Sequence, residues 1–188
     1  MLFAQAVNTT TQVTWAFDLG TASQTATYSG TTSSYFNPDY FSVGSNLTLL
    51  DKYTQSGTTS GTLTCTRFQP KTSASGASDA DAVSFHIRPK TGLSFKPSTI
   101  SFYAMRYGTD GGTMVVKWVD KDGVVTTIKD PFSPVRNNNT TTSHLVSIDV
   151  STMNLSAVED AKLQIIVYGL GATKQFGISN LNVSGPLE

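Results

Sequence analysis

Large apolar residues alternate with polar residues along several short segments of the chain. In residues 82–89, Val83, Phe85 and Ile87 fall on one side, and polar or charged residues fall on the other. A period of two is the pattern of a β-strand that buries one of its sides. The same pattern predicts strands in residues 12–20, 40–53, 61–68, 99–107, 113–120, 124–128, 144–150, 161–168 and 176–184.

Turn-forming residues separate these segments at short intervals. Residues 109–112 (TDGG) and 121–123 (KDG) suit tight hairpins, because Asp and Gly tolerate the positive φ that such turns require. We therefore expect residues 82–128 to form an antiparallel meander. Residues 130–143 read as a long loop, and residues 153–160 are expected to hold one helical turn. The whole pattern predicts an all-β protein, an antiparallel β-sandwich of jelly-roll type.

The length of 188 residues suits a single domain with its own core. We predict one β-sandwich domain over residues 1–188. Met1 and the closing Leu187 and Glu188 resemble cloning remnants, so we expect a domain excised from a larger multidomain protein. The first residues lack the basic start and the apolar stretch of a secretion signal, which carries little weight in an excised domain.

Positive and negative residues balance along the chain. Lys and Arg together number 13, as do Asp and Glu, so the formal net charge is zero. No long-range field therefore attracts the chain to nucleic acid or to an anionic membrane surface. The longest apolar runs, such as residues 165–168, are too short to cross a bilayer. We expect no nucleic-acid partner and no membrane insertion.

Residues typical of common catalytic sites are missing from the sequence. Cys65 is the one cysteine, which excludes an internal disulfide framework and a multi-cysteine metal cluster. The chain has no Gly-x-Ser-x-Gly motif, and its two histidines, His86 and His144, lack the spacing of metal ligands. The Asp residues in turns have a local backbone role, so no acid–base pair can be assembled. We predict a protein that is not an enzyme.

Basic and aromatic residues are concentrated between residues 86 and 117. Five Lys and Arg residues follow His86 there, against one acid, Asp110. By alternation, Arg88, Tyr103 and Tyr107 point away from the core side of their strands. If these strands share a sheet, one exposed face carries aromatic rings beside cationic groups.

Such a face suits a sugar polymer. The apolar C–H face of a pyranose packs on an aromatic ring, while its hydroxyls need directional partners. Arg also matches the carboxylate of a uronic acid, which favours an acidic polysaccharide. The predicted carbohydrate-binding residues are His86, Arg88, Tyr103, Arg106, Tyr107, Lys117 and Arg136.

Loops at one end of the sandwich offer an alternative site. Arg136, Asn137 and Lys174 could form it together with Asn138 and several loop aromatics. These aromatics are Tyr35, Phe36, Tyr40 and Phe41. The sequence leaves the loop site and the sheet-face site both open.

A structural calcium ion is an option for a jelly roll, bound by backbone carbonyls and one or two Asp residues. Asp18, Asp39 and Asp149 are the candidate ligands, and none has EF-hand-like spacing. No other cofactor is expected. Trp15 and Trp118 alternate with apolar neighbours, so we expect both in the core rather than at a site.

Several segments resemble a known group of domains. They are FDLG (17–20), FKPSTISFYAMRYGTDGG (95–112), VRNN (135–138) and YGLGATKQFGISNLNVSG (168–185). They are similar to non-catalytic β-sandwich domains attached to secreted polysaccharide-degrading enzymes of gut Bacteroidetes, pectate-lyase-type enzymes among them. The resemblance covers most of the chain. It implies a carbohydrate-binding module of the galactose-binding-like kind, secreted, periplasmic or on the cell surface, with a catalytic domain in the same parent chain.

Three functions are open at this point. The first is non-catalytic carbohydrate binding that targets an attached enzyme to plant cell-wall polysaccharide, with a pectic glycan favoured by the Arg residues. The second is a structural or adhesion domain, which would dock partners through an exposed sheet edge or apolar patch. The third is a small polysaccharide lyase or hydrolase, in which Tyr, Lys and Arg would abstract a proton from a uronate. The sequence favours the first.

Overall fold

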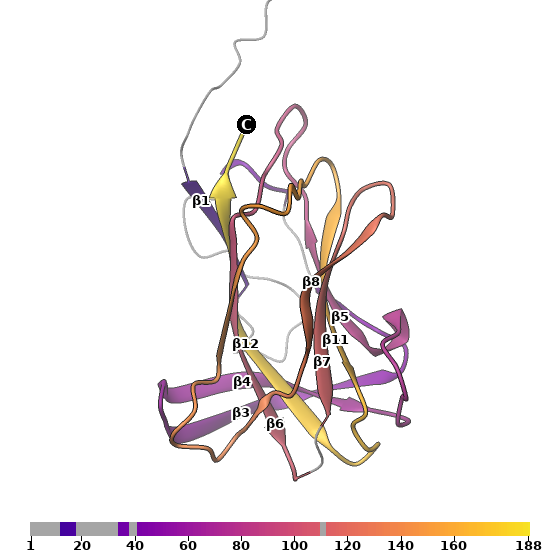
Figure 1. Ribbon diagram of the computed structural model, residues 1–188, viewed down its shortest axis with the longest axis vertical. Coiled ribbons are helices and arrows are strands. Elements are labelled where there is room, and N and C mark those ends of the chain that lie inside the picture. The colour runs from indigo at the N-terminus through magenta and orange to yellow at the C-terminus, as the bar shows by residue number, and fades with distance from the viewer. Residues whose placement is uncertain (1–11, 18–33, 38–40, 110–111) are drawn as a thin grey trace, which may run out of the picture.

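The computed structural model describes residues 12–17, 34–37, 41–109 and 112–188. They form two β-sheets that pack face to face (Figure 1). The seven-stranded sheet has the order β10-β6-β12-β4-β3, with β1 beside β12 and β9 beside β6. Its strands are β1 (Gln12–Phe17), β3 (Leu47–Thr58), β4 (Gly61–Pro70), β6 (Thr99–Tyr107), β9 (Val135–Arg136), β10 (Leu145–Asp149) and β12 (Gln175–Pro186).

The facing sheet has five strands in the order β2-β5-β11-β7-β8. They are β2 (Phe41–Val43), β5 (Ala82–Ile87), β7 (Thr113–Val119), β8 (Val125–Phe132) and β11 (Ala161–Tyr168). All pairings in both sheets are antiparallel except the short parallel pair of β6 and β9. The predicted all-β sandwich of jelly-roll type is confirmed.

The core lies between the sheets and contains the alternating apolar residues. Phe85 of β5 and Phe102 of β6 are fully buried in it, as their spacing predicts, and Trp118 of β7 is also buried there. Phe68 of β4 stacks on Phe176 of β12 with 5.2 Å between the ring centroids. Burying each such side chain contributes about 1.5–3 kcal/mol, so this layer holds the two sheets together. The side chain of Trp15 lies outside the described residues.

The predicted meander over residues 82–128 is wrong. β5 pairs with β2 and β11, whereas β6 pairs with β12, β10 and β9 in the other sheet. Within the described part of this region, only β7 and β8 form a hairpin. Residues 88–98 therefore cross from one sheet to the other. A turn signal marks the end of a strand, but it does not say whether the chain returns in the same sheet or crosses to the facing one.

Two further segments differ from their predicted structure. β8 continues to Phe132 and β9 forms at Val135–Arg136, both inside the segment expected to be a loop. Residues 153–160 form turns and bends rather than a helical turn. Across the described residues, no helix is long and apolar enough to cross a membrane.

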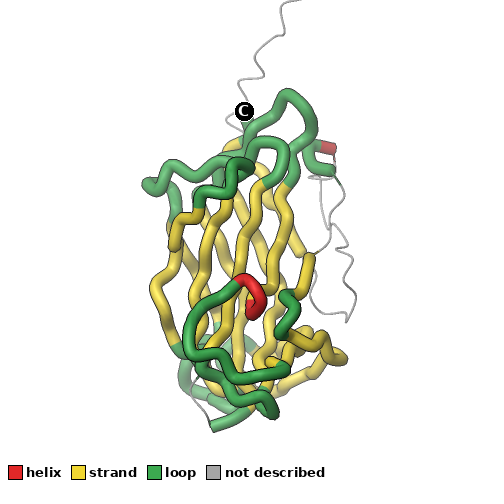
Figure 2. The backbone as a smooth tube through the Cα atoms, turned by 90° about the vertical axis from the view of Figure 1, so that its right-hand side faces the viewer, coloured by secondary structure: helices red, strands yellow, loops and turns green. Residues whose placement is uncertain are grey.

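The loop of residues 71–81 folds back over the outer side of the five-stranded sheet (Figure 2). The backbone N–H of Gly169 donates to the carbonyl of Ala74 at 2.8 Å, which ties the loop to the end of β11. The Asn46 side chain holds the start of the loop, since it donates to the carbonyl of Thr72 and accepts from its N–H, both at 3.0 Å. Three residues of this outer side are buried: Ala82, Val115 and Ile166.

Candidate functional site

The seven residues predicted to bind carbohydrate do not share one face. Three of them belong to the five-stranded sheet or follow its β5: His86, Arg88 and Lys117. The other four belong to the seven-stranded sheet: Tyr103, Arg106, Tyr107 and Arg136. The prediction of one aromatic and basic platform is therefore wrong. Alternation fixes which side of its own strand a residue occupies, but the outer sides of two packed sheets face in opposite directions.

His86 and Arg88 form an ion-pair cluster with Asp160. His86 Nδ1 lies 3.0 Å from Asp160 Oδ1, and Arg88 Nε lies 3.2 Å from the same oxygen. Burial disfavours the ionised carboxyl, but the hydrogen bonds from Arg88 and His86 outweigh it and lower the pKa of Asp160. Both groups are engaged with a carboxylate of this chain, which suits a structural role better than sugar binding.

Lys117 lies in the five-stranded sheet, whereas Arg106 and Arg136 are neighbours in the seven-stranded sheet. Lys117 lies half-buried on the outer side of β7. The guanidinium of Arg106 holds backbone in place, because Nε donates to the carbonyl of Pro134 at 3.0 Å and Nη1 to that of Gly108 at 2.7 Å. Arg136 is exposed on β9, beside Arg106 in the parallel pair.

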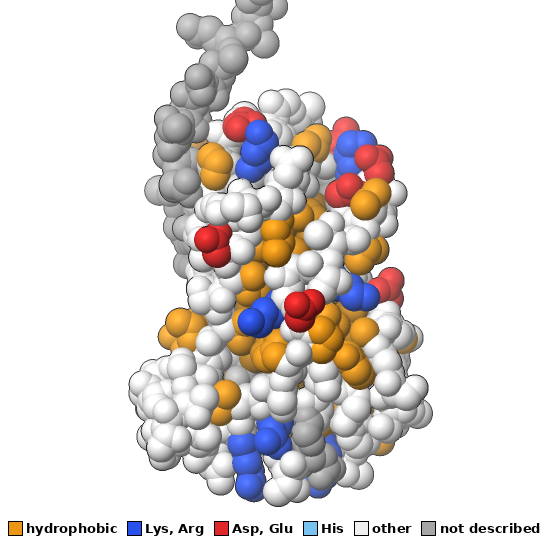
Figure 3. Space-filling model, viewed as in Figure 1, with side chains coloured by type: hydrophobic (Ala, Val, Ile, Leu, Met, Phe, Trp, Pro, Cys, Tyr) orange, Lys and Arg blue, Asp and Glu red, His pale blue; other side chains and the backbone are white. Residues whose placement is uncertain are grey.

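Two residues of the alternative loop site, Lys174 and Asn137, have identified neighbours within the chain. Lys174 packs near Gly108, where an added Cβ would lie 3.2 Å from Lys174 Cδ. Figure 3 shows Lys and Arg side chains gathered at this lower end of the molecule. Asn137, however, donates its amide hydrogen to Gln55 Oε1 at 3.0 Å, so it serves to join the loop after β9 to β3.

Two of the four loop aromatics belong to the core rather than to a surface. Phe36 and Phe41 are buried in the core, and the Phe36 ring meets Phe95 edge-on at 5.3 Å. Tyr35 is exposed, and Tyr40 lies outside the described residues. The interpretation of this segment as a sugar site is therefore wrong for its two phenylalanines.

The outer side of the seven-stranded sheet, in contrast, carries a group of tyrosines. Tyr103 and Tyr107 of β6 lie on it together, as their spacing predicts, and Tyr53 of β3 joins them. The ring centroids of Tyr53 and Tyr107 are 5.3 Å apart, and the guanidinium carbon of Arg67 lies 5.5 Å from the Tyr53 ring. The tyrosine face consists of Tyr53, Arg67, Tyr103, Tyr107 and Gln175.

Gly177 of β12 makes this arrangement possible. β12 lies between β4 and β6, so the Tyr107 side chain must cross it to meet Tyr53. A Cβ on Gly177 would lie 2.9 Å from the Tyr107 hydroxyl oxygen and 2.9 Å from Cys65 Cβ. Both distances are shorter than van der Waals contact. The missing side chain is what lets the Tyr107 ring lie over β12.

A small apolar cluster lies beneath the rings, separate from the main core. Leu63, Cys65 and Met105 are buried in it, and Tyr103 and Tyr107 pack against it. Burial raises the pKa of the Cys65 thiol to about 12. Burial, and next the neighbouring Cys65, raises the pKa of the Tyr107 hydroxyl above its usual range. Both groups are uncharged at neutral pH, so the cluster supports the rings as an apolar floor.

Arg67 and Gln175 supply directional polar groups beside the rings. Arg67 donates from Nη1 to Gln175 Oε1 at 3.1 Å and from Nε to the carbonyl of Asp51 at 2.9 Å. Gln175 in turn donates to Gln69 Oε1 at 3.3 Å. Tyr53 is 40% exposed next to this chain of contacts. An exposed ring beside fixed polar groups can hold a ligand that has both apolar and hydroxyl-bearing surfaces.

Tyr53, Arg67 and Gln175 are functional candidates that sequence reasoning misses. Counted by alternation from the buried Leu47, Tyr53 falls on the core side, but a bulge between Leu50 and Tyr53 moves it to the outer side. Arg67 is on the same side of β4 as Leu63 and Cys65. Alternation within residues 61–68 therefore predicts that these three side chains share one side of the strand. The chain gives no signal that β4 and β6 are separated only by β12.

Of the three candidate calcium ligands, only Asp149 lies within the described residues. Asp18 and Asp39 lie outside the described residues. Asp149 Oδ1 accepts hydrogen bonds from the Ser151 hydroxyl at 2.6 Å and N–H at 2.9 Å, and these bonds lower the pKa of Asp149. In residues 12–17, 34–37, 41–109 and 112–188, no group of three His, Cys, Asp or Glu is placed to hold a metal ion. A structural calcium ion stays a prediction.

Comparison with known proteins finds similar folds among solved structures. No family model and no curated protein matches the chain. The chain is similar to the CBM27-1 module of Caldicellulosiruptor saccharolyticus in complex with mannohexaose, at 11% identity and a TM-score of 0.48, over 93% of this chain and 97% of that one. It is also similar to the CBM22-1 xylan-binding domain of Paenibacillus barcinonensis, at 11% identity and a TM-score of 0.39, over 77% and 84%.

A third similar structure is an exo-β-agarase, at 12% identity and a TM-score of 0.41, over 77% of this chain and 23% of that one. These are partial likenesses at 11–12% identity, and the all-β sandwich of this chain is established by its own two sheets.

Proposed function

We propose that the protein is a non-catalytic module that binds a polysaccharide chain on the tyrosine face. The observation that carries this proposal is the exposed Tyr53 ring packed against Tyr107, with Arg67 and Gln175 held beside it. Sugar rings lie on the aromatic surfaces through their C–H faces, and their hydroxyls exchange hydrogen bonds with the polar side chains. An open sheet face can accommodate an extended chain of sugars, whereas a closed cavity cannot.

The chemistry of the face favours a neutral glycan as the first candidate. Arg67 is the one cation of the tyrosine face, and two of its N–H groups already donate to Asp51 and Gln175. The acidic preference inferred from the sequence relied on Arg88, Arg106 and Lys117, none of which lies on this face. Mannan and xylan oligosaccharides, the ligand classes of the similar modules, are therefore the first probes.

The proposal includes an attached catalytic domain in the parent chain and a location outside the cytoplasm. By binding the polysaccharide, the module would keep the attached enzyme on its substrate. In one structure of similar fold, a CBM22-1 module and a GH10 module from Clostridium thermocellum belong to one chain. The equivalent arrangement here is a proposal about the parent protein.

The direct test is calorimetric titration of the protein with mannohexaose, xylohexaose and polygalacturonate. Replacing Tyr53 by Ala removes the most exposed ring of the face, so Tyr53→Ala should lower affinity about tenfold for whichever glycan binds. Tyr35→Ala is the matched control, because Tyr35 has the same 40% exposure but lies away from the face. Its affinity should equal that of the unchanged protein.

Three results would decide the matter. Binding of a neutral hexasaccharide that is weakened only by Tyr53→Ala supports the proposal. Stronger binding of polygalacturonate would keep the face and change the glycan class to an acidic one. Failure of all three probes to bind, or equal losses in both variants, would contradict binding at the tyrosine face and favour a structural or adhesion role.

A further inference from the structure

The outer part of the β3–β4 hairpin extends as a two-stranded ribbon. β3 and β4 pair along their length, but β4 pairs with β12 only over residues 66–68, and Figure 1 shows β3 and β4 running across the direction of β12. Among the described strands, residues 51–65 therefore pair only with each other, and a lone two-stranded hairpin is marginally stable in water. At its tip the Thr59 hydroxyl donates to the carbonyl of Thr142 at 3.2 Å, but this contact is exposed. Contacts closer to the sheet must hold the ribbon in place.

The position of the ribbon decides how the tyrosine face is assembled. Tyr53 lies on the ribbon, whereas Tyr107 lies on β6, so the 5.3 Å between their ring centroids depends on where the ribbon lies relative to β6. The apolar cluster beneath the rings attracts the ribbon, and its buried members are Leu63, Cys65 and Met105. Hydrophobic attraction has no preferred direction. A directional contact is needed to fix the position of Tyr53.

Asn137 makes such a contact, and it connects the strands of both tyrosines. Its backbone N–H donates to the carbonyl of Arg106 at 2.9 Å, directly before Tyr107 in β6. Its side-chain amide donates to Gln55 Oε1 at 3.0 Å. Gln55 lies two residues after Tyr53, on the same side of β3. One half-buried residue therefore joins β6 beside Tyr107 to the ribbon beside Tyr53.

The β6 end of this connection is itself held in place on both sides of Asn137. The carbonyl of Arg136 accepts a hydrogen bond from His144 Nε2 at 2.9 Å, and His144 is buried. The Arg106 guanidinium donates to the carbonyl of Pro134 at 3.0 Å, which fixes the chain just before β9. The backbone of Asn137 is therefore a fixed point, and its side chain transmits that position to the ribbon.

We propose that Asn137 is a positioning residue of the tyrosine face: its bond to Gln55 holds the Tyr53 ring against Tyr107 in the arrangement that binds a glycan. Without the bond, the ribbon shifts and only a fraction of the molecules has the two rings together. The apparent affinity for a ligand falls by that fraction. A hydrogen bond of this kind changes such an equilibrium about two- to tenfold. The effect on glycan affinity rests on the proposed function, whereas the position of the rings does not.

The test first follows the two tyrosine rings by NMR in the glycan-free protein. The unchanged protein should show a nuclear Overhauser effect between the Tyr53 and Tyr107 rings, and Asn137→Ala should weaken it. Asn138→Ala is the matched control, because Asn138 is the exposed next residue of the same loop. Asn137→Asp should keep the effect, because the Gln55 amide can turn and donate to the new carboxylate.

Calorimetric titration with mannohexaose and xylohexaose then measures the consequence for binding. Asn137→Ala should lower the affinity about two- to tenfold for whichever hexasaccharide binds, and Asn137→Asp should restore most of it. Gln55→Ala should cause a similar loss. The double variant should lose no more than either single variant, because both changes break the same bond.

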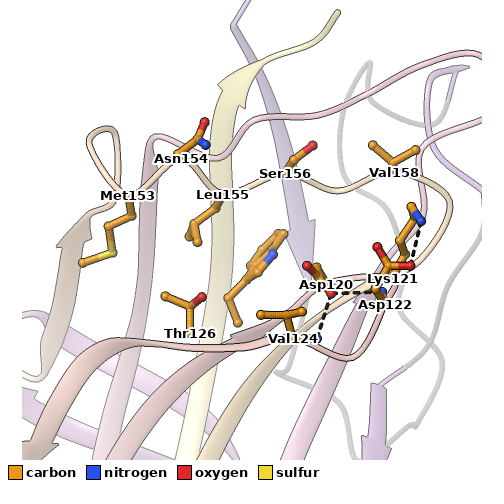
Figure 4. Close-up of a pocket in the computed structure, with 11 residues that line it drawn as sticks. Asp120, Lys121, Asp122, Val124, Thr126, Met153, Asn154, Leu155, Ser156 and Val158 are labelled. Carbon is orange, nitrogen blue, oxygen red and sulfur yellow. Dashed lines mark hydrogen bonds and ion pairs between the residues drawn. The ribbon is translucent and has the colours of Figure 1, made fainter.

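Asn154→Ala controls for a mere loss of stability. Asn154 has a φ of 51°, which Ala adopts only with strain, so this variant should also be less stable. Asn154 lies in the segment 153–158 beside the β7–β8 turn (Figure 4), and Figure 1 shows that turn towards the upper end of the molecule and β3 and β4 at the lower end. The ring signals and the affinity of Asn154→Ala should match those of the unchanged protein.

The outcomes separate this inference from the proposed function. Weakening of the ring contact in Asn137→Ala, when neither hexasaccharide binds even the unchanged protein, would support the positioning role and count against the glycan site. An unchanged ring contact in Asn137→Ala would overturn the inference whether or not a glycan binds. Equal losses in Asn154→Ala, or a lost ring contact with unchanged glycan affinity, would overturn it as well.

Discussion

Gly177 shows at the scale of a single residue how the tyrosine face depends on a missing side chain. The Tyr107 hydroxyl is buried beside the Cys65 thiol, and the ring lies across β12 over Gly177. The position of the Tyr107 ring relative to Tyr53 therefore depends on the space that Gly177 leaves beside Cys65.

Replacing Gly177 by Ala should consequently disturb both stability and binding. The new methyl group would meet Tyr107 and Cys65 at 2.9 Å, and overpacking of this kind costs about 1–3 kcal/mol. Gly76→Ala is the matched control, because an added Cβ there meets nothing within 4 Å. Urea unfolding of the two variants checks the prediction. Equal free energies of unfolding for Gly177→Ala and Gly76→Ala would refute this account of the residue.

At the scale of secondary-structure elements, the end of β5 is held to the start of β11 by charge. Asp160 precedes β11, while His86 and Arg88 lie at the end of β5, and β5 and β11 are neighbours in the sheet. The lowered pKa of Asp160 reports that its ionised form is favoured in the folded protein. The cluster therefore adds stability that depends on pH.

Asp160→Asn should lower the free energy of unfolding at pH 7 by less than about 1 kcal/mol, because the carboxylate is partly exposed and screened. The folded-state pKa of Asp160 lies below its unfolded value near 3.8, so this stabilisation is complete above that value and is lost as the pH falls through the folded-state pKa. Urea unfolding at pH 7 and pH 3 measures it. If the unchanged protein and Asp160→Asn differ in free energy of unfolding by as much at pH 3 as at pH 7, the assignment is contradicted.

Hydrophobic periodicity predicts the elements of this protein well. The predicted strands at 99–107 and 161–168 coincide with β6 and β11, because long alternating apolar runs leave little choice of structure. Periodicity cannot tell which sheet a strand joins, and β5 and β6 show the consequence. Their outward residues were expected on one face and lie on opposite sides of the sandwich.

The candidate site was predictable only where no irregularity intervenes. Tyr103 and Tyr107 are four residues apart on one regular strand, which is two full periods of the strand repeat, so their common face follows from spacing. Tyr53 follows a bulge, and its meeting with Tyr107 depends on a glycine in a third strand. Such contacts arise from sheet order, which a single sequence does not encode in its local pattern.

At the scale of the whole molecule, the two outer surfaces of the sandwich differ. The loop of residues 71–81 covers part of the five-stranded sheet (Figure 2), whereas the seven-stranded sheet carries the tyrosine face. The uncovered outer side of the seven-stranded sheet is therefore the side on which we propose that an extended glycan chain binds.

The most direct test of the central claim is an NMR map of the residues that respond to a bound hexasaccharide. Backbone and tyrosine ring signals would be followed during titration with mannohexaose and then xylohexaose. Our account predicts the largest shifts at the tyrosine face, with Tyr53 and Tyr107 foremost among them. Shifts centred instead on Lys117 and its neighbours in the five-stranded sheet, or no shifts with either ligand, would contradict it.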